Sequence, residues 1–273
     1  HLFESVLNEK ISIPFKRYTY QEVMEKYGSD KPDLRFGLEI IDFSDIFGQS
    51  GFRVFSEIIK SGGVIRGIKL PGGAGISRKQ IDNLTELIKQ NGGKGLAYIA
   101  RADGGIKSSI AKNLSQDEIN KCFERANLAE GDILFMVADK WKIVCDSLGA
   151  LRKELGRPLL NNNSPKWAFL WVTHFPLFEY KADLKRFDAM HNIVTSPCDS
   201  DIKYLDEGFN SQLPLDHSDH PWGKIRANQY DMVINGMETA SGGIRIHDRK
   251  MQEKVLSILG INSERAEKMF GFL

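Results

Sequence analysis

The sequence predicts an α+β protein in which a two-layer unit with a mostly antiparallel sheet is flanked by segments of a second antiparallel sheet. Three observations predict this class. Strand-like and helix-like stretches alternate between about Asp42 and Gly156. Strand-like, aromatic-rich segments dominate after Asn161. The length of 273 residues is enough for about two ordinary domains at roughly 100–200 residues each. We therefore expect segments 1–41 and 158–273 to surround a separate domain at 42–157.

The helices of the middle region carry clear start signals. Ser77 with Gln80, and Ser115 with Glu118, have the spacing of capping boxes. The first of these helices presents one apolar stripe, formed by Ile81, Leu84, Leu87 and Ile88. Gly92 is placed to end it. A third helix, "WKIVCDSLGALRKELG", follows the last strand of the region.

The strands of the middle region are short apolar runs. We expect "RVFSEII" and "VIRGIKL" to form a hairpin joined at residues 61–63. "GLAYIARA" and "GDILFMVAD" are the third and fourth strands. The order of strands and helices predicts the two-layer arrangement.

The flanking regions contain shorter signals. Thr19 can cap a helix from Tyr20 to Tyr27 that turns Val23 inward, and Gly28 ends it. "KWAFLWVTHFPLFEY" is strand-like. In "YDMVING", alternation predicts a strand that buries Tyr230, Met232 and Ile234. A last helix is expected from about Arg249 to Leu259.

The bulk properties are those of a globular protein without a membrane partner. Net charge is +1, with 41% hydrophobic and 27% charged residues. The apolar runs are far shorter than the ~20 residues that a membrane span needs. Three cysteines, Cys122, Cys145 and Cys198, fit no metal knuckle and predict reduced thiols in a cytoplasmic protein. The chain opens at His1 without an initiator Met, which favours a piece of a longer protein.

One segment is locally basic. Between Lys60 and Lys112 there are ten Lys/Arg against three Asp/Glu, an excess of +7. A solvated basic surface and an RNA-facing surface are both compatible with this excess.

Two carboxylates and an arginine stand out near the end of the chain. Asp231 and Glu238 repel each other at close range unless a cation lies between them. Mg²⁺ with a triphosphate is one such cation, and an ion pair with Arg245 is the alternative. Arg245 is expected to be buried, so it needs a carboxylate or phosphate partner, and its planar fork suits a small carboxylate. The glycines at 242 and 243 would let a ligand approach the backbone.

The histidines and the other glycine-rich stretch are weaker signals. His191 in "AMHNIVTSP" has both a structural and a ligand-binding interpretation. His217 and His220 in "HSDH" lack a third metal ligand and predict a solvated loop. "GIKLPGGAG" lacks the Gly-Lys-Ser/Thr ending of a phosphate loop, so we expect no nucleotide there.

Several stretches, taken together and in order, resemble the bacterial-type aspartyl-tRNA synthetase family. They are "YGSDKPDLRFGLEI", "LPGGAGISRKQID", "KGLAYI", "AMHNIVTSP", "YDMVINGME" and "GGIRIHD". The similarity extends over essentially the whole chain. It implies a class II antiparallel catalytic sheet interrupted by the inserted GAD domain of these enzymes.

The resemblance also implies a reaction, its cofactors and its partners. Family members activate L-aspartate with ATP and Mg²⁺ to aspartyl-adenylate and transfer it to tRNA-Asp, as homodimers in the cytoplasm. By position, His191 and Arg245 match aspartate-binding residues. Glu238 matches the acidic residue that contacts ATP and its Mg²⁺. Asp231 matches a carboxylate that supports the metal site.

The chain departs from the family in two respects. Asn192 and Ile193 follow His191 where the family usually has a second His and a Pro. The anticodon-binding barrel, motifs 1 to 3 and the segment that closes over aspartate have no counterpart in the sequence. We therefore expect little activity from the chain alone and open edges in the flanking sheet. The alternative is a non-catalytic tRNA-binding or interaction module derived from the synthetase.

Overall fold

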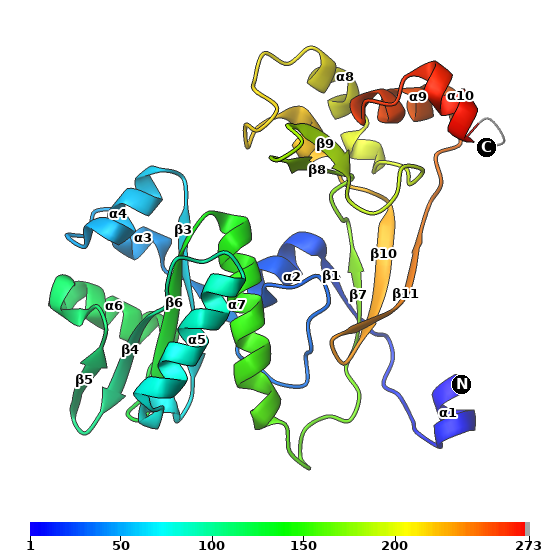
Figure 1. The fold of residues 1–273 in the computed structure, drawn as a ribbon. Helices are drawn as coiled ribbons and strands as arrows, with labels where there is room; N and C mark the ends of the chain where they lie inside the picture. Colours follow the sequence, from blue (N-terminus) through cyan, green and yellow to red (C-terminus); the bar gives the residue numbers. More distant parts are fainter. Residues whose placement is uncertain (271–273) are drawn as a thin grey trace. The chain divides into compact units, whose positions relative to one another are not determined.

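The computed structural model describes residues 1–270 and divides into two compact units (Figure 1). We call residues 22–168 with 235–237 the middle unit. Residues 1–21, 169–234 and the described residues from 238 onward form the terminal unit. Each unit has its own sheet and is described by itself.

The sheet of the middle unit has five strands in the order β2-β3-β6-β4-β5. They are β2 (Ile40–Asp42), β3 (Val64–Leu70), β4 (Ala97–Ala102), β5 (Gly105–Ser108) and β6 (Ile133–Asp139). Every neighbouring pair is antiparallel, as the sequence predicts. The central strand β6 is buried at six of its seven residues, so both of its faces need cover.

Helices cover both faces of this sheet (Figure 1). They are α3 (Ser44–Phe47), α4 (Arg53–Lys60), α5 (Arg78–Gln90), α6 (Gln116–Ala126) and α7 (Trp141–Gly156). One apolar cluster joins Phe135 of β6 to Ile88 of α5 and Leu148 of α7. The other joins Leu134 of β6 to Phe55 of α4 and Cys122 of α6. The α+β class is confirmed, but the expectation of two layers is wrong, because β6 is apolar on both sides.

The expected hairpin before β3 is also wrong. Residues 53–60 form the helix α4, and Ser61 and Gly62 turn the chain into β3. Phe55 and Ser56 are buried while Arg53 and Glu57 are exposed, which is helical rather than strand spacing. The β-branched residues of this stretch favour a strand locally, and packing of one helical face on the sheet overrides that preference.

Several other helix predictions are confirmed. Both capping boxes are present, at Ser77 of α5 and Ser115 of α6. Helix α2 (Tyr20–Tyr27) buries Val23 and ends at Gly28, whose φ is +66°. A Cβ at Gly28 would lie 2.3 Å from the carbonyl oxygen of Cys145, so only glycine allows this approach to α7.

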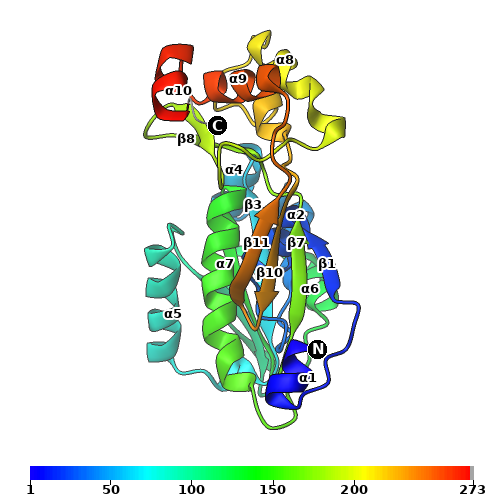
Figure 2. The ribbon, with the colours of Figure 1, turned by 90° about the vertical axis from the view of Figure 1, so that its right-hand side faces the viewer.

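The sheet of the terminal unit has the order β1-β7-β10-β11 (Figure 2). Its strands are β1 (Lys16–Thr19), β7 (Phe169–Thr173), β10 (Gln229–Ile234) and β11 (Met237–Gly243). β1 runs parallel to β7, and β10 antiparallel to it. Asn235 and Gly236 join β10 to β11 with φ of 52° and 80°, as in the tight Asn-Gly turns of hairpins. Within the described residues β11 is an outer strand, and six of its seven residues are exposed.

Smaller elements complete the terminal unit. They are α1 (Leu2–Leu7), the hairpin of β8 (Phe178–Lys181) and β9 (Arg186–Ala189), α8 (Lys203–Phe209), α9 (Arg249–Ile258) and α10 (Ser263–Phe270). A third apolar cluster joins the hairpin, α8 and α9 through Phe187, Leu205 and Val255. No helix within residues 1–270 combines the length and the apolar character needed to cross a membrane.

Strand β10 turns the opposite face inward from the one expected. Asp231 and Val233 are buried, whereas Tyr230 is 45% exposed. An aspartate can take the inner face because its carboxylate receives hydrogen bonds there, which offset the cost of leaving water. The inversion brings Asp231 to the interior side of the hairpin that also carries Glu238.

Candidate functional site: the Arg245 pocket

The terminal unit contains a pocket of about 290 Å³ at the end of the β10–β11 hairpin that lies away from its turn. It is lined by Asn192, Val194, Thr195, Gln229, Ser241, Gly242, Gly243 and Arg245, and we call it the Arg245 pocket. Its volume is at the lower end of the ~300–1,000 Å³ of small-molecule sites. The lining is mostly polar, so a ligand there would be recognised by hydrogen bonds and charge.

The loop on one side of the pocket is ordered by Asn192. The amide oxygen of Asn192 accepts hydrogen bonds from the backbone N–H groups of Val194 and Thr195, at 3.1 and 2.8 Å. It also accepts the hydroxyl of Thr195 at 2.6 Å. Three donors fix this end of the amide as the oxygen, because a nitrogen there would face three donors. The nitrogen Nδ2 is therefore the atom of Asn192 that is left for a ligand.

Glycines form another part of the wall. A Cβ on Gly242 would lie 2.6 Å from the hydroxyl of Tyr230, which is closer than real atoms approach. A Cβ on Gly243 would lie 3.1 Å from the carbonyl oxygen of Asn228. A side chain at Gly242 would thus have to displace the exposed ring of Tyr230, and the two glycines let the backbone of β11 line the pocket.

A hydrogen-bond network joins Gln229 and Ser241 of the pocket lining to the buried carboxylate of Asp231. Gln229 donates from Nε2 to the carboxylate of Asp231 at 3.0 Å and to the hydroxyl of Ser241 at 2.9 Å. Ser241 donates in turn to the same oxygen of Asp231 at 2.7 Å. Asp231 is 2% exposed. The carboxylate therefore orients two residues that line the pocket.

Arg245 supplies positive charge to the pocket. Its side chain is exposed, contrary to the buried position expected, and the neighbours Ile244 and Ile246 are exposed and buried respectively. Within residues 1–270 the guanidinium forms no ion pair or hydrogen bond with another side chain. Pairing with Asp231 or Glu238, the alternative interpretation, is therefore wrong for this structure. The charge remains available for an anion.

The other two predicted site residues lie outside the pocket lining. His191 is exposed, and its ring packs edge-on against Phe175 with 4.7 Å between ring centroids. Glu238 is exposed on the outer strand β11. Of the four predicted residues, the structure brings Arg245 and, through the network, Asp231 to the pocket. It does not bring His191 or Glu238 into the lining.

The carboxylates of Glu238 and Asp231 are the predicted ligands of Mg²⁺ with a nucleotide. In the described part of the chain no group of three or more His, Cys, Asp or Glu residues could hold a metal ion. Mg²⁺ that bridges phosphates needs only one or two carboxylates from the protein. The exposed carboxylate of Glu238 fits that role, and buried Asp231 fits an indirect one.

Sequence reasoning missed five residues of the pocket: Asn192, Val194, Thr195, Gln229 and Ser241. The signal for Gln229 is its position two residues before Asp231, which puts both side chains on one face of a strand. The signal for Asn192 is a Thr three residues later, since Asn often accepts hydrogen bonds from the backbone that follows it. Asn192 was noted only as a departure from the family.

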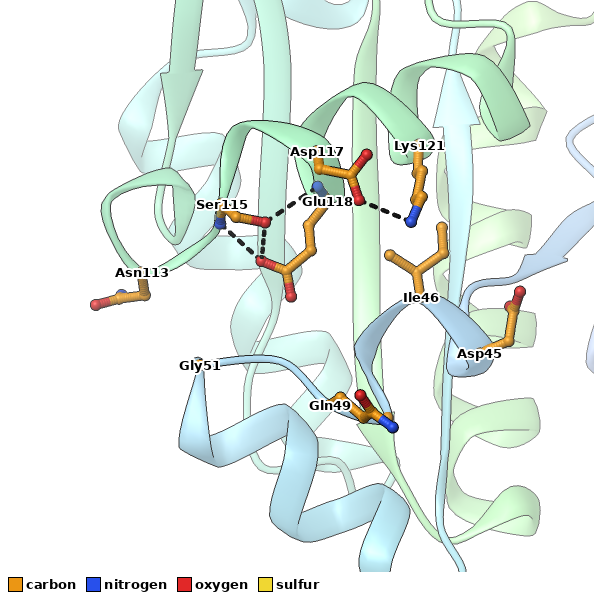
Figure 3. Close-up of a pocket in the computed structure, with 10 residues that line it drawn as sticks. Asp45, Ile46, Gln49, Gly51, Asn113, Ser115, Asp117, Glu118 and Lys121 are labelled. Atoms are coloured by element: carbon orange, nitrogen blue, oxygen red, sulfur yellow. Dashed lines mark hydrogen bonds and ion pairs between the residues drawn. The ribbon is translucent and has the colours of Figure 1, made fainter.

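A larger hollow of about 780 Å³ lies in the middle unit, between α6 and the segment formed by α3 and the loop after it (Figure 3). Its charged residues are Asp45, Asp117, Glu118 and Lys121. We call it the acidic hollow. Asp45 pairs with Arg125, whose second nitrogen lies 2.8 Å from the carboxylate. Asp117 pairs with Lys121 at 2.7 Å (Figure 3).

Glu118 completes the internal pairing of the acidic hollow. Its carboxylate accepts the backbone N–H and the hydroxyl of Ser115, at 2.6 and 2.8 Å, within the capping box of α6. Burial raises the pKa of Glu118, but hydrogen bonds from Ser50 and Ser115 outweigh it and hold the pKa below its usual range. The charges of this hollow are thus used by the fold, and its acidic character repels phosphates.

The locally basic segment is also partly neutralised. Acids outside the segment contact three of its cations: Asp42 with Arg66, Asp132 with Lys69, and Asp139 with Lys94. Two more cations pair within it, Lys89 with Glu86 and Lys107 with Asp103. The excess of +7 in the sequence therefore overstates the charge that the folded surface presents.

The "HSDH" histidines are not a solvated pair. His220 is 2% exposed and packs against the rings of Phe187 and Trp222. Burial, with a contribution from His217, lowers the pKa of His220. Its Nδ1 accepts the backbone N–H of Trp222, so the ring is structural.

The comparisons with known proteins identify first the class. Residues 55–148, from α4 to the middle of α7, match the family model described as the GAD domain. The middle unit therefore contains a GAD domain. The Arg245 pocket lies in the terminal unit, outside the matched residues.

The second comparison identifies the particular relatives. The chain is 45% identical over its full length to the aspartate–tRNA(Asp/Asn) ligase of Caldanaerobacter subterraneus subsp. tengcongensis. It is 45% identical to the aspartate–tRNA ligase of Clostridium perfringens and 44% identical to the aspartate–tRNA(Asp/Asn) ligase of Heliobacterium modesticaldum. The whole chain is thus homologous to a segment of bacterial aspartyl-tRNA synthetases. It spans 44%, 44% and 43% of the lengths of these three relatives.

Proposed function

We propose that the chain carries part of the catalytic site of an aspartate–tRNA ligase and that the Arg245 pocket binds L-aspartate. The observation that carries the proposal is the unpaired guanidinium of Arg245 in a glycine-walled pocket of a chain homologous to these enzymes throughout. A planar guanidinium holds a carboxylate through two hydrogen bonds. L-Asparagine would leave that charge without its partner and so bind less well.

The proposed roles of the other residues follow their positions. His191 borders the loop that begins at Asn192, and Phe175 limits the rotation of its ring. Its proposed role is to contact aspartate from outside the pocket lining. Glu238 would contact ATP and Mg²⁺ from the exposed strand β11. Asp231 would support that site indirectly, since one of its oxygens already accepts two hydrogen bonds.

The proposed reaction joins aspartate to tRNA in two steps. The α-carboxylate of aspartate attacks the α-phosphorus of ATP, forms aspartyl-adenylate and releases pyrophosphate. A hydroxyl of the terminal adenosine of tRNA-Asp then takes the aspartyl group and releases AMP. Bound Mg²⁺ would neutralise negative charge on the triphosphate. The contribution of these residues is to fix aspartate in place, which lowers the entropic part of the barrier.

Substrate range and assembly are further parts of the proposal. Two of the three relatives named above carry names that include both tRNA-Asp and tRNA-Asn, and the third only tRNA-Asp. We propose tRNA-Asp as the substrate. Homodimerisation in the cytoplasm would accompany the activity, and the three cysteines, free and buried, agree with that location.

The test is calorimetric titration of the 273-residue chain with L-aspartate, L-asparagine and L-alanine. Aspartate should bind best, and Arg245→Met should remove the preference. Aspartate-dependent exchange of pyrophosphate into ATP, measured on the natural product of the gene, tests the reaction. Binding of all three amino acids with equal affinity would contradict the proposal.

The alternative is a tRNA-binding module that acts through the basic segment. Titration with tRNA-Asp over a salt series separates the two functions, because phosphate contacts give an affinity that falls steeply with salt. The ion pairs of that segment with Asp42 and Asp132 favour weak binding. Tight, strongly salt-dependent binding together with indifference to aspartate would support the alternative.

A further inference from the structure

The lining of the Arg245 pocket contains a hydrogen-bond acceptor as well as donors. Gln229 is 5% exposed, and its Nε2 donates to both Asp231 and Ser241. The two hydrogens of that nitrogen are thus used. Within the described residues no donor meets Oε1 of Gln229, the remaining polar atom of a side chain that lines the pocket.

The orientation of this amide is fixed by its partners. A reversed amide would place Oε1 against the carboxylate of Asp231, where two acceptors would repel each other. In that orientation Oε1 would also face the oxygen of Ser241. The hydrogen of that hydroxyl is directed to Asp231 at 2.7 Å, so two acceptors would meet there as well. Asp231 is therefore a positioning residue that keeps an acceptor available in the pocket.

Asn192 and Arg245 offer donors to the same pocket. The amide oxygen of Asn192 is occupied by three hydrogen bonds, which leaves Nδ2 without a partner among residues 1–270. Arg245 adds a guanidinium without a partner there. A ligand that satisfies these groups carries an anionic oxygen group for the donors and an N–H or O–H group for the acceptor. An α-amino acid with an acidic side chain has both.

We propose that Gln229 accepts a hydrogen bond from the ammonium group of the amino acid whose carboxylate Arg245 and Asn192 hold. This inference rests on the proposed function and adds the residues that recognise the ammonium group. Gln229 is then a specificity-determining residue, which separates an amino acid from a plain dicarboxylate. Asn192 is a donor that keeps its charge state at every pH, unlike a histidine.

Succinate tests the inference because it has the two carboxylates of aspartate and no ammonium group. Calorimetry on the 273-residue chain should show aspartate bound about 10- to 100-fold more tightly than succinate, the worth of a hydrogen bond to a charged group. Gln229→Leu should weaken aspartate by that factor and leave succinate unchanged. Asn192→Ala should weaken both ligands equally.

Controls separate loss of the acceptor from loss of the fold. Gln116→Leu changes a glutamine in the middle unit whose amide bonds only Asn120, and it should alter neither ligand. Since Gln229→Leu removes a donor from buried Asp231, Ser241→Ala serves as the second variant. It leaves Oε1 in place but frees the amide to rotate, so aspartate should weaken by a smaller factor and succinate not at all.

The outcomes distinguish the two proposals. If the wild-type chain binds aspartate and Gln229→Leu lowers aspartate and succinate alike, Gln229 does not recognise the ammonium group and the inference fails alone. The same holds if Ser241→Ala and Gln229→Leu both leave the ratio of the two affinities unchanged. If the wild-type chain binds neither ligand, the proposed function and the inference fail together.

Discussion

The Arg245 pocket and the acidic hollow are both concave and polar, but they use their charges differently. In the acidic hollow, Asp45, Asp117 and Glu118 are each bonded to a neighbour in the same unit. In the Arg245 pocket, the guanidinium and the nitrogen of Asn192 have no partner within the described residues. The smaller cavity is therefore the better candidate for a ligand.

The difference shows which observation carries functional information. Volume and acidic composition favour the hollow of about 780 Å³ over the pocket of about 290 Å³. The hydrogen bonds favour the smaller pocket instead, because a group that already has a partner in the fold gains little from a ligand. The exposed guanidinium of Arg245 can exchange water for the oxygens of an anion without breaking a bond within the described part of the protein.

The largest expected effect concerns an arginine that donates from Nε and Nη2 to four backbone carbonyl groups. Arg152 of α7 is 3% exposed and donates to the carbonyl oxygens of Asp33, Phe36, Gly37 and Leu38 at 2.9 to 3.1 Å. Arg152→Met would leave these buried acceptors unsatisfied and should lower the free energy of unfolding by about 3 kcal/mol or more. Urea denaturation followed by circular dichroism measures the loss.

The control for Arg152 is Arg53→Met in α4. Arg53 has an 88% exposed side chain and pairs only with Glu57, so its removal should change stability by less than about 0.5 kcal/mol. Equal losses for the two variants would show that the four carbonyl contacts do not stabilise the segment from Asp33 to Leu38.

The next effect is on binding rather than on stability. Arg245→Met should weaken L-aspartate by about 100-fold or more, since two charge-assisted hydrogen bonds are lost. The free energy of unfolding should stay within about 0.5 kcal/mol of wild type, because no intramolecular partner is left behind. Calorimetry and urea denaturation on the same samples measure both.

Arg125→Met is the matched change in the acidic hollow. Arg125 pairs with Asp45, and that pairing lowers the pKa of Asp45. The variant should bind the ligand L-aspartate as wild type does. If Arg125→Met weakened aspartate as much as Arg245→Met, the contrast between the two cavities would be wrong.

A smaller effect, on the pH dependence of stability, is expected from an ion-paired arginine of the terminal unit. Arg226 donates to both oxygens of Asp201 and lowers the pKa of that carboxyl from 3.8 to about 2. Because the folded-state pKa is the lower one, the stabilisation is complete above about pH 4 and is lost as pH falls toward 2. It amounts to roughly 1 kcal/mol after allowance for the half-exposed guanidinium.

Thermal unfolding between pH 2 and pH 6 tests this expectation. Asp201→Asn should remove the additional loss of stability between pH 4 and pH 2 and should be less stable than wild type at pH 6. A variant with the same pH profile as wild type would show that the ion pair does not contribute.

The elements with local signals were predictable from the sequence. The capping boxes at Ser77 and Ser115 and the apolar strand β6 depend on short-range spacing and appear as expected. Helix α4 was mistaken for a strand because its β-branched residues favour one. The helices on both faces of the middle sheet follow from long-range packing, which spacing does not encode.

The site was predictable only in part for the same reason. Arg245 and Asp231 are recognisable from their motif, but Gln229 becomes informative only when Asp231 and Ser241 fix its amide. Likewise, the sequence shows Asn192 only as a departure from the family pattern. Its role follows from the structure, in which the backbone N–H and the hydroxyl of Thr195 donate to its amide oxygen. Both depend on which atom of an amide faces the pocket, and that follows from contacts between distant segments.

The smallest effect is expected at the surface of the acidic hollow. Lys121 and Asp117 pair one turn apart on α6, with side chains that are 56% and 72% exposed. Lys121→Ala should lower stability only slightly, as is usual for exposed ion pairs on a helix. The double variant Asp117→Ala with Lys121→Ala should lose no more stability than the sum of the single changes.

A thermal-shift screen of anions tests the contrast between the two cavities. A ligand that stabilised wild type but not Lys121→Ala would show that the acidic hollow keeps a cation for binding. That result would remove the distinction drawn between the two cavities, whereas identical responses of the two proteins would strengthen it.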